Sequence, residues 1–293
     1  MERFNKDLAL KVALDAAEAG AAVVMGGYGR RPAVRYKGAV NLLTEYDLRS
    51  EEVIRKIIGR AYPDHLVVGE EEGRSGSARS DYKWYIDPLD GTTNFAHGHP
   101  FFAISIGLWG PDGDGGQMPL VGVIQAPALG DLYWGRAGGG ARRRQIIPGR
   151  GLVESRLQVT ETDLLRGAML NTGFPYDMFE RGGEILHPFG RLVMAARAVR
   201  RAGSAAIDMA YVAAGLADAF WETGLKAWDV AAGLLLLKEA GGLVTDYQGA
   251  PYVLGLSRDI LGSNGRLHEP IMGFLNAPPG DEGGADDPPL LND

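Results

Sequence analysis

Apolar side chains recur at helical spacing in two segments near the start of the chain. Residues 5–25 place an apolar position every three or four residues, and Gly26-Gly27 end this pattern. A similar stripe runs through 44–61, and Pro63 lies just beyond it, where a helix does not continue. The spacing therefore predicts two amphipathic helices ahead of the first buried strand.

Short apolar runs follow and predict strands. Residues 66–68 and 84–86 have the character of buried strands, and each runs directly into acidic residues. Residues 101–109 and 120–125 are separated by a turn rich in Gly and Asp, which predicts a hairpin. Because α/β proteins place their chemistry where strand ends face a cleft, the acids after the first two strands are candidates for function.

The composition then changes toward Gly and Arg. A short strand is expected at 132–135, and residues 137–151 are predicted to form a mobile surface loop. Arg142, Arg143 and Arg144 form a basic run within this loop. We expect the run to be solvated, and contact with a second phosphate is the alternative.

Helices and strands alternate along the rest of the chain. Strands are expected at 168–171, 218–221, 243–246 and 259–263, and helical stretches at 183–198, 204–215 and 229–240. This alternation, without a detectable internal repeat, predicts a layered α/β fold. We expect a single catalytic domain over 1–276, in two tightly packed α/β halves with a boundary near 150–165, and a disordered acidic tail over 277–293.

Composition removes several classes of protein. The chain has 293 residues, 45% of them hydrophobic, so it can bury a large core, yet no apolar run approaches the roughly 20 residues of a membrane span. The N-terminal segment mixes acids and lysines into an Ala-rich pattern unlike a secretory signal, so we expect a cytoplasmic protein without membrane contact. The absence of cysteine excludes disulfides, thiolate metal sites and cysteine nucleophiles.

The formal net charge of −7 is unevenly distributed. Residues 277–293 hold five acids and no Lys or Arg, and without those five the remaining chain carries about −2. The overall charge is unfavourable for nucleic acid, which we do not expect as a partner, but the body is close to neutral. Charge therefore argues neither for nor against a small anionic substrate.

The most informative segment is Asp87-Pro88-Leu89-Asp90-Gly91-Thr92-Thr93-Asn94-Phe95. A strand delivers Asp87, Pro88 sets a turn, and Asp90 follows three residues later, so two carboxylates and the Leu89 carbonyl can face one cavity. Such hard oxygen ligands suit Mg²⁺. Gly91 permits close approach of the backbone to a ligand, and the N–H groups of residues 91–93 can hold a phosphate if they open a helix. The alternative is an ordinary turn, in which Asp, Pro and Gly are all common.

Other acids are weaker candidates by local sequence. Glu70 follows a buried strand and could complete a metal site, although consecutive glutamates usually form a solvated loop. Asp47 has the pattern of an ordinary exposed helix acid. Asp229 stands where a helix N-cap belongs, and an N-cap aspartate that faces a cleft can also hold a metal. His97 and His99 follow the motif, but packing or capping is the expectation for them rather than metal binding.

Together these segments resemble the inositol monophosphatase family, part of the lithium-sensitive, metal-dependent phosphatase superfamily that includes fructose-1,6-bisphosphatases. The resemblance rests on Gly69-Glu70-Glu71, on Asp87 to Phe95, and on Trp228-Asp229-Val230-Ala231-Ala232-Gly233, in the family's order. Arg201 to Ala206 and Glu222 also look like its substrate-facing segments. It extends over nearly the whole chain, and it implies the layered αβαβα sandwich of inositol monophosphatases and fructose-1,6-bisphosphatases.

The resemblance also implies roles for individual residues. The ligands of two or three Mg²⁺ ions would be Glu70, Asp87, the Leu89 carbonyl, Asp90 and Asp229. Thr92, paired with Asp47, would orient the attacking water with help from Glu70, and backbone N–H groups near Gly91 and Thr92 would hold the phosphate. The residues that face the polyol hydroxyls would be Asp90, Ser204, Ala205 and Glu222.

The expected function is Mg²⁺-dependent hydrolysis of a small phosphate monoester, with inositol monophosphate as the first substrate, in a lithium-sensitive homodimer. The alternatives within the same chemistry are fructose-1,6-bisphosphate, histidinol phosphate, a nucleotide 3′-phosphate and NADP. An alternative of another class is a protein that interacts with the transcription machinery, as some bacterial members of the family do, with incidental phosphatase activity. Phosphoryl transfer from ATP is not expected, because the chain has no P-loop motif.

Overall fold

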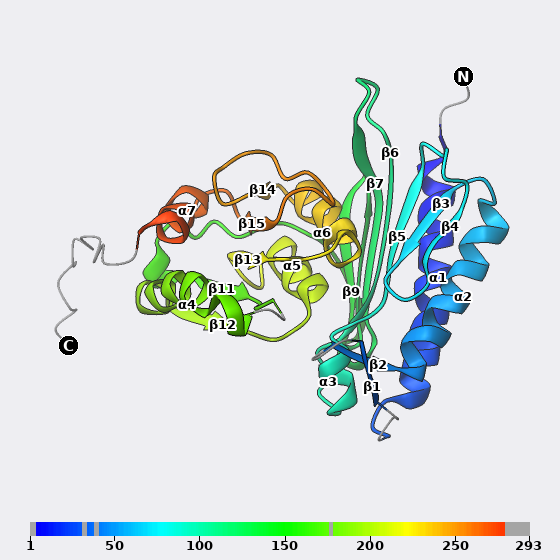
Figure 1. Cartoon of the computed structure of the whole chain (residues 1–293), viewed down its shortest axis with the longest axis horizontal. Helices are drawn as coiled ribbons and strands as arrows, with labels where there is room; N and C mark the ends of the chain where they lie inside the picture. Colours follow the sequence, from blue (N-terminus) through cyan, green and yellow to red (C-terminus); the bar gives the residue numbers. More distant parts are fainter. Residues whose placement is uncertain (1–3, 31–33, 38–40, 176–177, 279–293) are drawn as a thin grey trace.

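The computed structural model describes residues 4–30, 34–37, 41–175 and 178–278, and its elements stack in five layers (Figure 1). The layers are, in order, helices α1 (Lys6–Gly27) and α2 (Glu45–Ala61), an eight-stranded sheet, helices α5 (Ala205–Ala213) and α6 (Ala227–Glu239), a five-stranded sheet, and helices α4 (Met178–Ala195) and α7 (His268–Asn276). The layered αβαβα sandwich expected from the sequence is confirmed. The tail expected over 277–293 lies outside the described residues except for Ala277 and Pro278.

The larger sheet has the strand order β10-β9-β8-β7-β6-β5-β3-β4. Its strands are β3 (Leu66–Gly69), β4 (Gly73–Gly76), β5 (Lys83–Asp90), β6 (Ala103–Pro111), β7 (Gln117–Ala126), β8 (Asp131–Arg136), β9 (Gly140–Ile147) and β10 (Gly151–Arg156). Among the pairs of this sheet, β3 and β5 are parallel and the others antiparallel. Because parallel strands end at the same edge, the residues after β3 lie beside the end of β5, and the Glu70 N–H donates to the Ile86 carbonyl at 3.2 Å.

The smaller sheet has the order β12-β11-β13-β15-β14. Its strands are β11 (Met169–Thr172), β12 (Ala198–Arg200), β13 (Ala219–Thr223), β14 (Leu243–Thr245) and β15 (Asp259–Ser263). A separate two-stranded ribbon pairs β1 (Val34–Lys37) with β2 (Asn41–Thr44), and a short helix α3 (Thr92–Ala96) follows β5. The chain passes from the larger to the smaller sheet between Arg156 and Met169. That the two halves form a single catalytic domain stays a prediction.

Three hydrophobic clusters lie between the layers. The first packs α1 and α2 against one face of the larger sheet, where alanines of α1 meet Ile54 and Ile58 of α2 and Trp84 of β5. The second fills the space between the two sheets, and the third lies between the smaller sheet and α4 and α7. Helices α5 and α6 are apolar on almost all sides, which suits helices that are covered by a sheet on either side.

Helix α6 packs directly on the larger sheet because glycines leave room for it. A Cβ at Gly107 would lie 2.8 Å from the Ala231 carbonyl carbon, and one at Gly122 would lie 2.6 Å from the Ala232 carbonyl oxygen. The Trp109 indole N–H donates to the Ala231 carbonyl at 3.2 Å, and this hydrogen bond fixes the position of α6 along its axis relative to the sheet. The first turn of α6, which carries Asp229, is thereby brought to the edge of the sheet where β5 ends.

The surface loop predicted over 137–151 is wrong. These residues form most of a β-hairpin, β9 and β10, that extends the larger sheet. The basic run is not simply solvated either, because Arg143 donates to both carboxylate oxygens of buried Asp131 at 2.9 Å and lies over the Tyr133 ring. Arg144 covers the Trp134 ring in the same way. Cross-strand contacts with aromatic side chains of β8 therefore order a segment whose composition favours a loop.

Smaller differences concern element boundaries. The helix predicted at 183–198 begins earlier and ends at Ala195, and residues 198–200 instead form the edge strand β12. Strands β1, β2 and β4 were not predicted; they have four residues each, and every residue of β4, Gly73–Gly76, is exposed. Among the described residues, no helix is both long and apolar enough to cross a membrane.

Candidate active site

The end of β5 places two aspartates in one cavity. The pairing of β5 with β6 is regular up to Asp87 and shifts register before Asp90, so the strand bulges at Pro88 and Leu89. The Leu89 N–H donates to the Asp87 carboxylate at 3.0 Å, and Asp87 is 2% exposed. Both aspartates and Leu89 line a cavity of about 430 Å³.

Gly91 joins this turn to helix α3 in a conformation that other residues rarely adopt. Its φ of +93° is left-handed, and a Cβ there would lie 3.0 Å from the Phe101 carbonyl oxygen and 3.2 Å from that of Gly203. The Asn94 side chain donates to the Phe101 carbonyl at 2.7 Å and to the Ala202 carbonyl at 2.8 Å. The Asn94 side chain therefore links the segment before β6 of the larger sheet to the segment that follows β12 of the smaller sheet.

Asp47 is buried, so the expectation of an ordinary exposed helix acid is wrong. It is 1% exposed and lies in the first turn of α2, where its Oδ2 accepts from the Thr44 N–H at 2.8 Å as part of a capping box. Its Oδ1 accepts from the Thr92 hydroxyl at 3.0 Å. Local sequence could not show this, because the partner lies 45 residues away.

The second half of the chain closes the cavity. Asp229 is the third residue of α6 rather than its N-cap, which is Lys226; the Asp229 Oδ2 accepts from the Lys226 N–H at 2.6 Å. Ser204 caps α5, and its hydroxyl donates to Asp90 Oδ2 at 2.6 Å, while the Ala206 N–H donates to the same oxygen at 2.7 Å. Glu222, from β13, is 9% exposed.

The cavity gathers nearly all of the residues selected from the sequence. Those that line it are Glu70, Asp87, Leu89, Asp90, Gly91, Thr92, Ser204, Ala205, Glu222 and Asp229. Asp47 reaches it through Thr92. His97 and His99 do not line it, and the His99 ring accepts a long hydrogen bond from the Phe101 N–H at 3.4 Å. The arrangement brings acids from both halves of the chain to one place.

One acidic lining residue escaped the sequence analysis. Asp208 of α5 is 1% exposed and lines the cavity, and its Oδ1 has no hydrogen-bond partner among the described residues. The available signal was an acid inside the otherwise apolar run Ala205 to Ala213, where a charged residue needs a reason.

Burial and repulsion between neighbouring carboxylates raise the pKa values of these acids. Burial raises the pKa of Asp87 well above its usual range, and the charges of Glu70, Asp90 and Asp229 raise it further. Burial also raises the pKa of Asp90 to about 6, although hydrogen bonds from Ser204 and Ala206 oppose the change. For Asp229, burial and the Asp90 charge raise the pKa well above its usual range. This concentration of negative charge favours a cation.

The chemistry of the donors fits a divalent metal. Carboxylate and carbonyl oxygens are the ligands that Mg²⁺ takes in proteins. Asp87, Asp90 and Asp229 each use one carboxylate oxygen in the hydrogen bonds described above, so a second oxygen of each is available for a cation. As the side chains lie in the described residues, however, no group of three or more acids or histidines is arranged to hold an ion. The fit is therefore one of donor type and charge.

Glu222 of β13 and Asp208 of α5 form an acidic pair on a second wall of the cavity. Burial, with the charges of Asp229 and Asp90, raises the pKa of Glu222 to about 8, and Arg201 opposes this rise. Burial raises the pKa of Asp208 well above its usual range, with a contribution from Glu222. A carboxyl group in its neutral form, which the pKa of Glu222 favours at pH 7, can donate a hydrogen bond as well as accept one.

Comparison with known proteins identifies relatives over almost the whole chain. The sequence profile described as the Inositol monophosphatase family matches residues 5–276. Inositol-1-monophosphatase of Synechocystis is 38% identical over 92% of this chain and 89% of its own. Fructose-1,6-bisphosphatase/inositol-1-monophosphatase of Aquifex aeolicus is 38% identical over 93% and 96%, and Nus factor SuhB of Pseudomonas aeruginosa is 40% identical over 82% and 86%. The solved structure of inositol monophosphatase from Anabaena superposes with a TM-score of 0.80, at 39% identity, over 95% of this chain and 99% of that one.

Proposed function

The chain belongs to the inositol monophosphatase family, and from this premise we propose that it hydrolyses inositol monophosphate in a Mg²⁺-dependent reaction. The observation that carries the proposal is the convergence of Glu70, Asp87, Asp90 and Asp229 on one cavity, from the ends of β3 and β5 and from the first turn of α6. Four acids that repel one another at such a place destabilise the protein unless a cation or protons neutralise them.

We propose that Glu70, Asp87, the Leu89 carbonyl, Asp90 and Asp229 hold two Mg²⁺ ions, with Glu70 also near a weaker third. When bound, these ions would neutralise phosphate oxygens and lower the pKa of the attacking water. The structural support is the oxygen-only donor set and the strong mutual effect of these acids on one another's pKa.

The chain's own groups orient the reactants in this proposal. Asp47 accepts a hydrogen bond from the Thr92 hydroxyl, so the lone pairs of that hydroxyl are left to accept one from the attacking water. Thr44 in turn fixes Asp47, which keeps the pair in place. The backbone N–H groups near Gly91 and Thr92 would donate to the phosphate, which the left-handed Gly91 allows to approach closely.

The polyol would contact the wall formed by Ser204, Ala205 and Glu222 together with Asp90. Because Ser204 already donates to Asp90, this aspartate is oriented before any substrate arrives. Glu222, whose pKa of about 8 in the metal-free protein favours the neutral form at pH 7, would donate to or accept from a substrate hydroxyl. Such groups recognise a compound rich in hydroxyls better than an apolar one.

The test is phosphate release from a panel of substrates with Mg²⁺ titrated in. The panel holds inositol monophosphate, fructose-1,6-bisphosphate, histidinol phosphate, a nucleotide 3′-phosphate and NADP, and we expect the highest kcat/KM on inositol monophosphate. A clear preference for another member would reject inositol monophosphate as the main substrate, while the proposed phosphatase reaction would still stand. The name of the Aquifex relative makes fructose-1,6-bisphosphate the first competitor to measure.

A second function is kept because relatives named Nus factor SuhB are as similar to this chain as those named inositol-1-monophosphatase. In this alternative the protein serves as a partner of the transcription machinery and its hydrolysis is incidental. Replacing the chromosomal copy with Asp87→Asn separates the two. If the variant loses activity and no longer fulfils the protein's role in the cell, the enzyme is supported. If it loses activity but still fulfils that role, the transcription partner is supported.

We propose from the same premise that Li⁺ inhibits the enzyme and that it forms a homodimer. Inhibition is measured as Mg²⁺-dependent phosphate release with increasing Li⁺, and the dimer by sedimentation equilibrium. The expected cytoplasmic location stays a prediction, which fractionation of the producing cells would test.

A further inference from the structure

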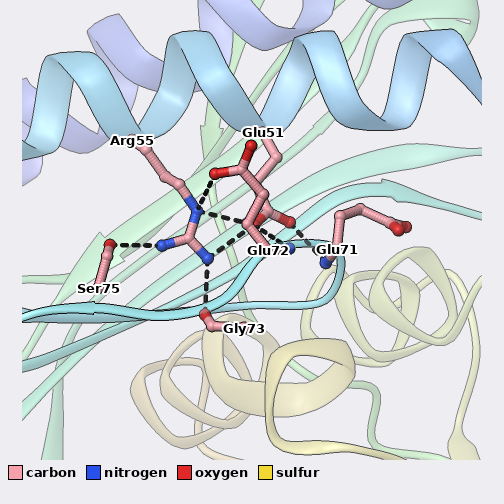
Figure 2. Close-up of polar contacts among 6 residues, drawn as sticks. All are labelled: Glu51, Arg55, Glu71, Glu72, Gly73 and Ser75. Carbon is pink, nitrogen blue, oxygen red and sulfur yellow. Dashed lines mark hydrogen bonds and ion pairs between the residues drawn. The ribbon is translucent and has the colours of Figure 1, made fainter.

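A buried ion pair on α2 contacts the turn that follows Glu70 (Figure 2), and neither of its residues lines the cavity. Glu51 and Arg55 are four residues apart on α2, and their side chains are 0% and 9% exposed. Arg55 Nε donates to Glu51 Oε1 at 2.7 Å. A charge pair this deeply buried is stable only when its remaining donors and acceptors are also satisfied.

Glu51 satisfies its acceptors with the backbone of the turn. Its two carboxylate oxygens accept from the Glu71 N–H at 2.8 Å and from the Glu72 N–H at 2.9 Å (Figure 2). These are the two residues directly after Glu70. The end of the strand before the turn also lies against the Glu51 side chain: a Cβ at Gly69 would lie 2.3 Å from Glu51 Oε1. Glu51 therefore sets the path of the backbone on both sides of Glu70.

Arg55 holds the strand that leaves the turn. Its Nη2 donates to the Gly73 carbonyl and its Nη1 to the Ser75 hydroxyl, both at 2.6 Å (Figure 2). Glu72 adds a longer ion pair at 3.6 Å. Arg55 also neutralises Glu51, which would otherwise be an unpaired buried charge near an already acidic site.

The same face of α2 holds the other acid-bearing segments of the first half. Asp47 accepts from Thr92, and the Ser50 hydroxyl donates to the Pro88 carbonyl at 2.9 Å, between Asp87 and Leu89. Asp47, Ser50 and Glu51 are spaced by three and four residues, so they share one face of the helix. One helix thus grips three segments that each carry a proposed site residue.

We propose that Glu51 and Arg55 are positioning residues that fix Glu70 in the divalent-cation site, so that metal affinity depends on an ion pair outside the cavity. This inference rests on the proposed function, in which Glu70 binds metal. Partners that orient metal ligands typically change metal affinity or activity by about 10- to 100-fold when they are altered.

The helix offers a matched control. Glu45 and Arg49 have the same order and spacing on α2, but their closest atoms are 3.9 Å apart and both side chains are 59% exposed. We would compare Glu51→Gln with Glu45→Gln, and Arg55→Lys with Arg49→Lys. The buried glutamine would point an NH₂ group at N–H donors, and the lysine would lose the planar fork that reaches Gly73 and Ser75 together.

The experiment measures the Mg²⁺ concentration for half-maximal phosphate release, Mg²⁺ binding by calorimetry, and the free energy of unfolding without metal. We expect Glu51→Gln and Arg55→Lys to raise the Mg²⁺ midpoint and the calorimetric Kd by about 10-fold or more, with kcat largely restored at saturating Mg²⁺, and the Glu45 and Arg49 variants to stay within about twofold. If Glu51→Gln does not fold, Arg55→Lys decides alone.

Two results would overturn the inference, and they are distinguishable. A lower free energy of unfolding with unchanged Mg²⁺ midpoint and Kd would make the pair purely structural, with the proposed function intact. Failure of the unaltered protein to bind Mg²⁺ or release phosphate would instead remove the proposed function and the inference with it.

Discussion

The two walls of the cavity are built in different ways. On the first wall, side chains of α2 form hydrogen bonds with the Pro88 carbonyl, the Thr92 hydroxyl and the Glu71 N–H. On the second wall, Glu222 and Asp208 are buried acids with raised pKa values, and Asp208 Oδ1 lacks a hydrogen-bond partner among the described residues.

This difference teaches how one phosphatase core can serve several substrates. The first wall is fixed by contacts within the protein, so it positions charge in the same way for any phosphate. The second wall holds hydrogen-bonding capacity that a bound polyol can satisfy. Changes on the first wall should therefore affect all substrates alike, and changes on the second should alter the preference among them.

The largest effect is expected for Asp87→Asn, which tests the first wall. We expect kcat/KM to fall by about 10⁴-fold on every member of the substrate panel, or roughly 5 kcal/mol, because the proposed cation site loses one of its charged ligands. At the same time the metal-free protein should become more stable, since a repelling buried carboxylate is removed. Phosphate release and urea unfolding in EDTA measure the two effects.

The control is Asp15→Asn, on the exposed outer face of α1, which should change neither quantity. A uniform loss of stability in Asp87→Asn, or a loss of activity confined to one substrate, would contradict the division between the walls.

The second wall makes a prediction about pH. Burial raises the pKa of Glu222 to about 8, whereas the unfolded chain has a value near 4.5, so the folded state binds more protons between these pH values. The metal-free protein should therefore lose stability as pH rises from about 5 to 7.5, with at most about 3 kcal/mol of the loss due to Glu222. Glu222→Gln should flatten this slope in urea unfolding; an unchanged slope would show that Glu222 ionises freely.

The contact between the halves gives a smaller effect. Gly107→Ala would press a methyl group against the backbone of α6, and we expect a loss of stability of about 2 kcal/mol from overpacking. Because α6 carries Asp229, kcat/KM should fall together with Mg²⁺ affinity. Gly59→Ala is the control: its Cβ meets open space on α2, and it should stabilise the helix by about 0.5 to 1 kcal/mol. Equal thermal melting of the two variants would refute the close packing of α6 on β6.

The smallest effect is expected for Ser204→Ala. The variant loses the N-cap of α5 and the hydrogen bond to Asp90, which should cost about 1 kcal/mol of stability and roughly a tenfold drop in kcat/KM. Ser204→Thr keeps the hydroxyl and should recover most of both. A variant series in which threonine behaves like alanine would show that the hydroxyl contact is unimportant.

The sequence could predict the site where its signals are local. Asp87 to Phe95 combines a buried strand, a turn residue and a glycine within a few positions, and these determine the observed bulge and the left-handed Gly91 without reference to distant residues. The stripes of α1 and α2 were equally legible, because their periodicity depends only on which face is buried.

What could not be predicted depends on distant partners. The Glu51–Arg55 and Glu45–Arg49 pairs are identical as sequence patterns, yet one is buried behind a turn and the other is exposed. The β9–β10 hairpin depends on Asp131 and the aromatic rings of β8, so its own composition suggests a loop. Asp208 becomes a site residue only when α5 is packed between the two sheets.

The most direct test of the central claim is a crystal structure with Mn²⁺ in place of Mg²⁺, in which anomalous scattering locates the ions. We expect peaks in the cavity within bonding distance of carboxylate oxygens of Asp87, Asp90, Asp229 and Glu70. Peaks found only elsewhere, with these four carboxylates making no contact to the ions, would contradict it.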